Sequence, residues 1–259
     1  MKKYTIEDLR DIVATLRGEN GCPWDRAQTH QSLKKDMIEE CYEAIDALDS
    51  GDDHAFANEL GDVLLQVIFH SRLAEERGAF DFNDVLEEVC TKLITRHTHV
   101  FGEDKAVSAE EALGQWEKNK KKEKNLDSYT AMLLDVPQYL PALMRSAKIQ
   151  KKAASVGFDW KETDGVYDKI REETNELREA VSTGNMEKIE EEYGDLLFSI
   201  VNLGRHLKLT PEIALTKASN KFIGRFEKME KAAISDGLDL ANLTDEQLDE
   251  LWNAVKRQK

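Results

Sequence analysis

The sequence predicts an all-α fold that contains two copies of one helical module. Apolar residues recur three or four positions apart along most of the chain, as in Leu60, Val63 and Leu64, and this is the spacing of one face of a helix. Only 4 prolines and 14 glycines interrupt the 259 residues. No series of alternating apolar and polar residues predicts a sheet. The third observation is a pattern that recurs 133 residues further along the chain.

The repeat joins EExxE to ExGD in both halves. The segment EECYEAIDALDSGDDHAFANELGD aligns without a gap with EETNELREAVSTGNMEKIEEEYGD. The matched residues are Glu39, Glu40, Glu43, Gly51, Glu59, Gly61 and Asp62 in the first copy, and Glu172, Glu173, Glu176, Gly184, Glu192, Gly194 and Asp195 in the second. Arg72 and Arg205 continue the same register. EExxE occurs at no other position, so we interpret the two halves as a duplicated module.

Each copy predicts a pair of antiparallel helices. In the first, the helix containing residues 39–50 runs into DSGDDHA, where Gly and Asp favour a turn before the helix that carries ELGD. Residues three and four apart share a helix face, so the carboxylates of each copy are expected at one level. Gly61 and Gly194 are expected to allow close approach of the paired helices. Thr244 and Gln247 form a capping box that begins the last predicted helix.

A lysine-rich stretch separates the copies. EKNKKKEKNLDSY contains five lysines and is typical of a solvated face or a linker. Pro137 and Pro141 then interrupt helical continuity. We place the domain boundary at residue 125, which gives an N-terminal domain of residues 1–125 and a C-terminal domain of residues 126–259.

Composition excludes several classes of protein. The net charge of −15 repels polyanions, so direct nucleic-acid binding is not expected. No apolar run reaches the length of a membrane span, and the N-terminus lacks the apolar core of a secretory signal. Cys22, Cys41 and Cys90 form an odd set without CxxC spacing. We therefore expect no disulfide framework, and a cytoplasmic location.

The carboxylates of each copy form a candidate metal site. The two quartets are Glu40, Glu43, Glu59 and Asp62, and Glu173, Glu176, Glu192 and Asp195. Carboxylates ~4 Å apart repel by about 4 kcal/mol per pair at an effective dielectric constant near 20, so a counter-ion is required. All-oxygen ligation favours Mg²⁺, with Mn²⁺ as a substitute. A solvated acidic face is the alternative, which the duplication disfavours. A di-iron site is also disfavoured, because no histidine follows a glutamate by three residues.

A basic stripe follows the second quartet. Lys217, Lys221 and Arg225 are spaced by four and therefore share one helix face. Beside a metal, such cations would neutralise a polyphosphate. Arg96 is part of a weaker counterpart in the first half. Trp252 lies on the apolar stripe of the last helix, where it either packs in the core or stacks on a base.

Together these motifs resemble the MazG family of nucleoside triphosphate pyrophosphohydrolases, relatives of the all-α dUTPases. The resemblance covers essentially the whole chain. It rests on GCPWDRAQTH, EECYE, ELGD and RHTHVF in the first half, and on EETNE, EEEYGD, NKFIGRF and LWNAVKRQ in the second. It implies Mg²⁺-dependent hydrolysis of NTPs and dNTPs to NMP and pyrophosphate, for control of the nucleotide pool, by a homodimer of tandem MazG domains.

The resemblance also implies a role for each candidate residue. The catalytic set is Glu172, Glu173, Glu176, Glu192 and Asp195, of which the last four bind the metal. Glu40, Glu43, Glu59 and Asp62, the metal quartet that the residues themselves indicate in the first half, could bind metal weakly, bind nucleotide without turnover or mainly support dimerisation. Substrate contacts come from Lys169, Lys188, Glu191, Asp195, Lys221, Arg225 and Trp252, with Arg96 and Lys120 in the first half. Glu172 or Glu191 is the general base. We expect the second half to hold the working site, because its cations and Trp252 suit a nucleotide better.

Two other functions remain open from the sequence. The chain could be a nonenzymatic nucleotide-binding regulatory module, which an assay of Mg²⁺-dependent pyrophosphate release excludes or supports. It could also be a restricted dUTP or phosphoribosyl-ATP pyrophosphatase, which a panel of nucleotide substrates distinguishes.

Overall fold

The protein is helical throughout its described part. The computed structural model describes residues 3–124 and 126–257, and every regular element in these ranges is a helix. The all-α prediction is therefore confirmed for the described residues. The chain divides into two compact units, one ending at Glu123 and the other beginning at Lys124. No helix in the described ranges is both long and apolar enough to cross a membrane.

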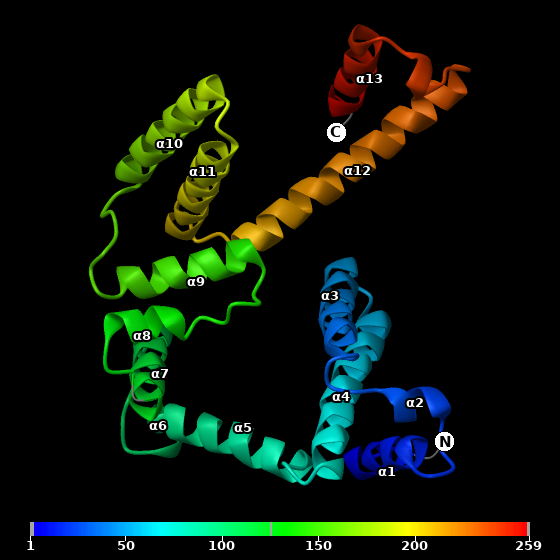
Figure 1. Ribbon diagram of the computed structural model, residues 1–259, viewed down its shortest axis with the longest axis vertical. Helices are drawn as coiled ribbons and strands as arrows, with labels where there is room; N and C mark the ends of the chain where they lie inside the picture. Colours follow the sequence, from blue (N-terminus) through cyan, green and yellow to red (C-terminus); the bar gives the residue numbers. More distant parts are fainter. Residues whose placement is uncertain (1–2, 125, 258–259) are drawn as a thin grey trace. The chain divides into compact units, whose positions relative to one another are not determined.

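The first unit contains helices α1 to α7 (Figure 1). They are α1 (Ile6–Arg17), α2 (Pro23–Ala27), α3 (Lys34–Ser50), α4 (Asp53–Glu76), α5 (Phe82–Arg96), α6 (Thr98–Phe101) and α7 (Ala109–Glu123). The second unit contains α8 to α13 and one short 3₁₀ turn. These are α8 (Tyr129–Leu134), α9 (Ala142–Ala154), α10 (Thr163–Thr183), α11 (Met186–His206), α12 (Pro211–Ser235), η1 (Leu240–Asn242) and α13 (Asp245–Arg257).

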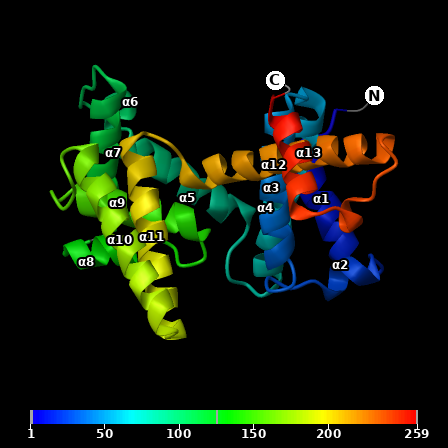
Figure 2. The same ribbon diagram turned by 90° about the horizontal axis from the view of Figure 1, so that it is seen from above.

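The two helices of each predicted hairpin, α3–α4 in the first unit and α10–α11 in the second, are antiparallel and lie side by side (Figures 1 and 2). The two pairs have the same turn. Gly51 and Gly184 cap α3 and α10 in the left-handed conformation, with φ of 75° and 69°, which glycine adopts without strain. The side chains of Asp52 and Asn185 then each accept hydrogen bonds from two backbone N–H groups of the following helix. The predicted hairpins and their common register are confirmed.

The predicted role of the two glycines beside the carboxylates is wrong. A Cβ atom added at Gly61 or Gly194 would meet no heavy atom within 4 Å. The paired helices therefore pack through other faces, and these two positions lie at open surfaces of their units. Neither glycine is required for close approach of the paired helices.

The core of the first unit lies where α1 and α5 pack on α4. Its buried side chains are Val13, Leu33, Ile68, Phe69, Leu73 and Phe82. Because these residues come from α1, from the segment ahead of α3, from α4 and from the start of α5, the core fixes the position of α4 and, through α4, that of the acidic helix α3.

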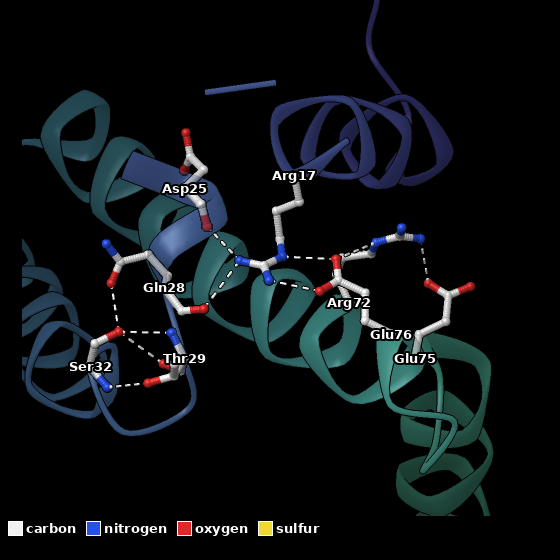
Figure 3. Close-up of polar contacts among 8 residues, drawn as sticks. All are labelled: Arg17, Asp25, Gln28, Thr29, Ser32, Arg72, Glu75 and Glu76. Atoms are coloured by element: carbon white, nitrogen blue, oxygen red, sulfur yellow. Dashed lines mark hydrogen bonds and ion pairs between the residues drawn. The ribbon is translucent and has the colours of Figure 1, made fainter. Parts of the chain in front are cut away.

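Arg17 joins α1 to α4 and to the segment ahead of α3 (Figure 3). Its side chain is only 7% exposed, and Nε and Nη2 donate to the Glu76 carboxylate at 2.9 and 2.7 Å. Nη1 donates to the backbone carbonyl oxygens of Asp25 and Gln28. Arg72 also donates to Glu76 at 3.1 Å. These bonds, that of Arg17 above all, hold the pKa of Glu76 below its ordinary value.

In the second unit, a related contact holds the segment ahead of α10. The Asp159 carboxylate accepts a hydrogen bond from Arg205 on α11 and lies 3.2 Å from Nε2 of His206. Next to it, Trp160 packs against Gly165, where an added Cβ would lie 2.3 Å from the indole ring. The segment that leads into α10 is thus held by the polar contacts of Asp159 and by the packing of Trp160 against Gly165.

The remaining sequence predictions have mixed outcomes. The first four lysines of the stretch predicted as a solvated face or linker lie in the last turns of α7, where positive charge suits the end of a helix. Pro137 and Pro141 do separate α8 from α9. The capping box of α13 is confirmed, since Thr244 N donates to Gln247 Oε1 at 3.0 Å and Gln247 N to Thr244 Oγ1 at 3.3 Å. All three cysteines are free.

Candidate metal and nucleotide site

Helices α10 and α11 bring five carboxylates together. Glu173, Glu192 and Asp195 each offer an oxygen within 4.8 Å of the others, and so do Glu172, Glu173 and Glu176. Glu173 belongs to both groups, and the two helices therefore contribute to one continuous cluster. We call these five residues the second-unit cluster. Glu173 and Glu192 are buried in it, whereas Glu172 and Asp195 are exposed.

Two lysines provide the cations nearest to the cluster. Lys169, one turn before Glu173 on α10, places Nζ 2.7 Å from Glu172 Oε1 and 2.6 Å from Glu173 Oε1. These two bonds raise the pKa of Lys169, with burial acting in the opposite direction. Lys188 is on α11 and lies further away, with Nζ 3.8 Å from Glu192 Oε1. Lys169 is thus the principal counter-ion of the cluster.

The cluster nevertheless retains an excess of negative charge. Burial raises the pKa of Glu176, and the carboxylates of Glu192, Glu173 and Glu172 add to the effect in that order. Oε2 of Glu173 is buried and has no hydrogen-bond partner among the described residues. A buried acceptor without a partner is costly. Because the donors are all carboxylate oxygens, the group that suits them is a hard divalent cation such as Mg²⁺.

The first unit has a smaller cluster. Oxygens of Glu40, Glu59 and Asp62 lie within 4.8 Å of one another, and all three residues are half-buried. Burial raises the pKa of Glu40, and Asp62, Glu43 and Glu59 raise it further. Glu43 is exposed and stays outside the group of close oxygens, so the structure brings together three of the four residues predicted to meet.

The two clusters differ in their cations. Counting back 133 residues from Lys169 and Lys188 leads to Asp36 and Ala55. Asp36 lies one turn before Glu40 on α3 and contributes to the raised pKa of that carboxyl. The first-unit cluster therefore has an acid where the second has its counter-ion. The sequence contained this signal one turn upstream of the aligned repeat, and our sequence reasoning did not use it.

Several predicted substrate contacts lie on other helices of the second unit. Lys221 and Arg225 are on α12, and no ion pair among the described residues connects either of them to the carboxylates of α10 and α11. Trp252 on α13 is half-buried, with its ring centroid 5.1 Å from that of Phe222. Glu191 is exposed on α11 and belongs to neither carboxylate group.

A tryptophan with a lysine four residues later occurs in both units. Lys256 Nζ lies 5.9 Å from the ring centroid of Trp252, and Lys120 Nζ lies 5.3 Å from that of Trp116. The guanidinium of Arg96 also lies over Trp116 at 5.3 Å. Arg96 and Lys120, the two substrate contacts predicted for the first unit, thus both lie at the indole ring of Trp116. The W-x-x-x-K spacing of the two pairs is a second signal that our sequence reasoning missed.

Arg96 is fixed at this position by an ion pair. Its Nε and Nη2 donate to the two oxygens of Glu123 at 2.8 and 2.9 Å. The bidentate geometry orients the guanidinium, and its side chain is only 12% exposed. Arg96 consequently joins α5 to the end of α7.

The chain is similar over nearly its whole length to bacterial nucleoside triphosphate pyrophosphohydrolases. Residues 28–101 and 163–230 each match the MazG nucleotide pyrophosphohydrolase domain. A Thermotoga maritima protein named nucleoside triphosphate pyrophosphohydrolase/pyrophosphatase MazG is 49% identical over 97% of this chain and 95% of its own length. The Escherichia coli K12 nucleoside triphosphate pyrophosphohydrolase is 44% identical over 98% of each chain. The two matched segments include both carboxylate clusters.

Proposed function

Because this chain belongs to the MazG family of nucleotide pyrophosphohydrolases, we propose that it hydrolyses nucleoside triphosphates, ribo and deoxy, to the monophosphate and pyrophosphate with Mg²⁺. The observation that carries this proposal is the second-unit cluster, in which five carboxylates include a buried oxygen without a partner. Neutralising that charge is what a divalent cation does, and a triphosphate brings the cation as part of its complex. Removal of a triphosphate from the nucleotide pool fits a housekeeping role.

The metal would be held by residues of both helices. Glu173, Glu176, Glu192 and Asp195 are the proposed ligands, and Mn²⁺ is the expected substitute for Mg²⁺. Bound there, the ion would supply Lewis-acid polarisation of the phosphoryl oxygens and would lower the pKa of the attacking water. Glu40, Glu59 and Asp62 could hold a second ion in the first unit, with Glu43 at its edge.

The chain supplies the proton acceptor from the same cluster. Glu172 is exposed and lies beside Glu173 and Glu176, so it can reach a water at the surface of the site and take its proton. Glu191, the other candidate base, belongs to neither group of close oxygens. We therefore favour Glu172.

Cations and one aromatic ring would orient the nucleotide. Lys169 and Lys188 lie at the carboxylates and are the proposed partners of the triphosphate nearest to the metal. Lys221 and Arg225 are proposed to stabilise the charge that develops on pyrophosphate, and Trp252 to stack on the base. Arg96 and Lys120 are the corresponding candidates of the first unit.

A second copy of the chain is the proposed partner, which gives a homodimer. The helix pairs expose several large apolar side chains. Their exposed side chains include Ile38, Tyr42 and Ile45 on α3, and Tyr193, Phe198 and Ile200 on α11. Patches of this kind mark interfaces, and two helix pairs make one four-helix layer. Sedimentation of the full chain is expected to give twice the mass of 29.5 kDa, and a monomer at micromolar concentration would contradict the dimer. A cytoplasmic location stays a prediction.

Product analysis tests the proposed activity. The purified chain is incubated with each of the eight common NTPs and dNTPs and Mg²⁺, and the products are separated by ion-exchange chromatography. We expect equal amounts of NMP and pyrophosphate from several bases, and none in EDTA. NDP with orthophosphate would contradict the reaction, and an absence of turnover would favour the regulatory-module alternative. Turnover of dUTP alone when it is added to this panel as a ninth nucleotide, or of phosphoribosyl-ATP in a separate assay, would support the restricted pyrophosphatases instead.

A further inference from the structure

The ammonium group of Lys169 lies between two carboxylates of the second-unit cluster. One belongs to Glu173, a proposed metal ligand, and the other to Glu172, its neighbour in the sequence. The ammonium is within 2.7 Å of Oε1 of Glu172 and of Oε1 of Glu173. Glu173 is only 3% exposed, and its other oxygen has no partner. Lys169 therefore binds one oxygen of this buried carboxylate, and the other oxygen is available to a ligand.

We propose that Lys169 is an exchangeable counter-ion: it holds Glu172 and Glu173 while the site lacks metal, and it moves to the triphosphate when a divalent cation enters. This inference rests on the proposed function of the same site and adds a coupling between its two ligands. Metal binding releases a lysine for the phosphates, and phosphate binding removes a competitor of the metal. Each ligand then strengthens the binding of the other by the same factor.

Three properties of Lys169 support the exchange. A divalent cation at these oxygens would lie within a few ångströms of the ammonium, and like charges at that distance repel strongly. The lysine side chain is flexible and its ammonium is a compact charge that can change partners without a fixed geometry. The side chain is one-third exposed, so its path toward a ligand at the surface is open.

The first unit provides an internal contrast. At the position equivalent to Lys169 it has Asp36, one turn before Glu40. No lysine can therefore compete with metal from that position, nor pass from it to a phosphate. A metal bound at Glu40, Glu59 and Asp62 is therefore not coupled to nucleotide through a lysine at this position. Of the two clusters, only that of the second unit then has a lysine at this position that can pass from the carboxylates to a phosphate.

Binding of Mn²⁺ tests the exchange without any turnover. Free Mn²⁺ is followed by electron paramagnetic resonance in full-length protein carrying Glu59→Gln and Asp62→Asn, so that only the second-unit cluster is titrated. Lys169→Gln is expected to lower the Kd for Mn²⁺ about tenfold in the absence of nucleotide. Lys188→Gln is the matched control. It removes the same charge from a contact of 3.8 Å on an exposed side chain, and is expected to change the Kd less than threefold.

The coupling is measured by repeating the titration with saturating α,β-methylene-ATP. In the background protein the analogue is expected to lower the Kd for Mn²⁺ at least tenfold, and in Lys169→Gln by a factor about three times smaller, because only the direct attraction between metal and phosphates remains. Lys169→Met, which keeps the stem without the charge, gives the same test in a second variant. An unchanged or weakened affinity for Mn²⁺ in both variants would overturn the exchange. If the background protein itself binds no Mn²⁺, the proposed metal site fails and the exchange fails with it.

The reciprocal change is made in the first unit. In protein whose second-unit cluster is neutralised by Glu192→Gln and Asp195→Asn, Asp36→Lys introduces the counter-ion beside Glu40. We expect the Kd for Mn²⁺ at the first-unit cluster to rise at least tenfold. A Kd that does not rise would contradict the competition between ammonium and metal.

Discussion

Glu173 on α10 and Glu192 on α11 are buried carboxylates whose oxygens come within 4.8 Å of each other. Each has a lysine one turn before it on its own helix, at 2.6 and 3.8 Å. Two facing acids at this distance repel unless a cation joins them. A divalent cation between the two carboxylates would relieve this repulsion, and the relationship therefore supports the metal site proposed in the second unit.

Isotope labelling tests the point of attack. If water attacks the α-phosphorus, hydrolysis in ¹⁸O-water places the label in NMP and none in pyrophosphate. Mass spectrometry of both products measures this distribution directly. Label in pyrophosphate would mean attack at the β-phosphorus and would require a different position of the triphosphate relative to the cluster.

Substitution of Trp252 tests the proposed contact with the base. Loss of stacking costs about 1–3 kcal/mol, so Trp252→Ala is expected to raise KM about tenfold with little change in kcat, because the base is remote from the reacting phosphorus. Trp252→Phe, which keeps a ring against Phe222, is expected to raise KM less than threefold. Trp116→Ala is the control in the first unit. An equal rise in KM for Trp116→Ala would contradict the assignment of the nucleotide to the second unit.

Loss of Arg17 is expected to destabilise the first unit. Arg17→Ala removes two bonds to Glu76 and leaves the carbonyl oxygens of Asp25 and Gln28 without this donor. We expect a loss of about 2 kcal/mol in the free energy of unfolding, because a nearly buried charge pair is broken. Urea denaturation measures the loss, and Lys35→Ala, whose pair with Glu39 is exposed on both sides, is the control in the same unit with a change near zero.

The ion pair between Arg17 and Glu76 also predicts that the free energy of unfolding depends on pH in the acidic range. The folded-state pKa of Glu76 is lower than its unfolded value, so its contribution is fully present above the unfolded pKa, about 4.3. The contribution is lost as the pH falls from there through the folded pKa. In Glu76→Gln, the free energy of unfolding should therefore fall less steeply below about pH 5 than in the natural chain. Equal slopes in both proteins would contradict the shift.

Two glycine substitutions in the second unit should have opposite effects. Gly165→Ala places a Cβ 2.3 Å from the Trp160 ring, and we expect overpacking to cost about 1–3 kcal/mol. Gly224→Ala is also in a helix but meets nothing within 4 Å, and it should gain about 0.5–1 kcal/mol from helix propensity. Thermal unfolding measures both, and a stabilised Gly165→Ala would show that Trp160 does not pack as described.

Local patterns predicted the elements that depend on local interactions. The helix pairs, their shared turn at Gly51 and Gly184, and the cap at Thr244 follow from spacing and turn chemistry, which act within a few residues. The repeat located the carboxylates, because residues of one turn share a face wherever the helix packs. The difference between Lys169 and Asp36 was equally local and was available in the same alignment.

Contacts between distant segments were not predictable in this way. Arg17 has no motif around it, and its bonds to Glu76 depend on how α1 packs on α4. The free space at Gly61 and Gly194 likewise depends on which faces of the two helices pack together. Sequence spacing shows only which residues share a face. The separation of Glu43 from the first-unit group has the same origin, since side-chain position within a turn is set by packing.

Rates of the full chain with one cluster neutralised at a time test the central assignment most directly. Pyrophosphate release with Mg²⁺ and ATP is compared for Glu192→Gln with Asp195→Asn, and for Glu59→Gln with Asp62→Asn, with the helical circular dichroism of each checked first. We expect the second-unit pair to lower kcat/KM at least a hundredfold and the first-unit pair to lower it less than threefold. The assignment would be contradicted if the protein with Glu192→Gln and Asp195→Asn stayed active while the protein with Glu59→Gln and Asp62→Asn lost its activity.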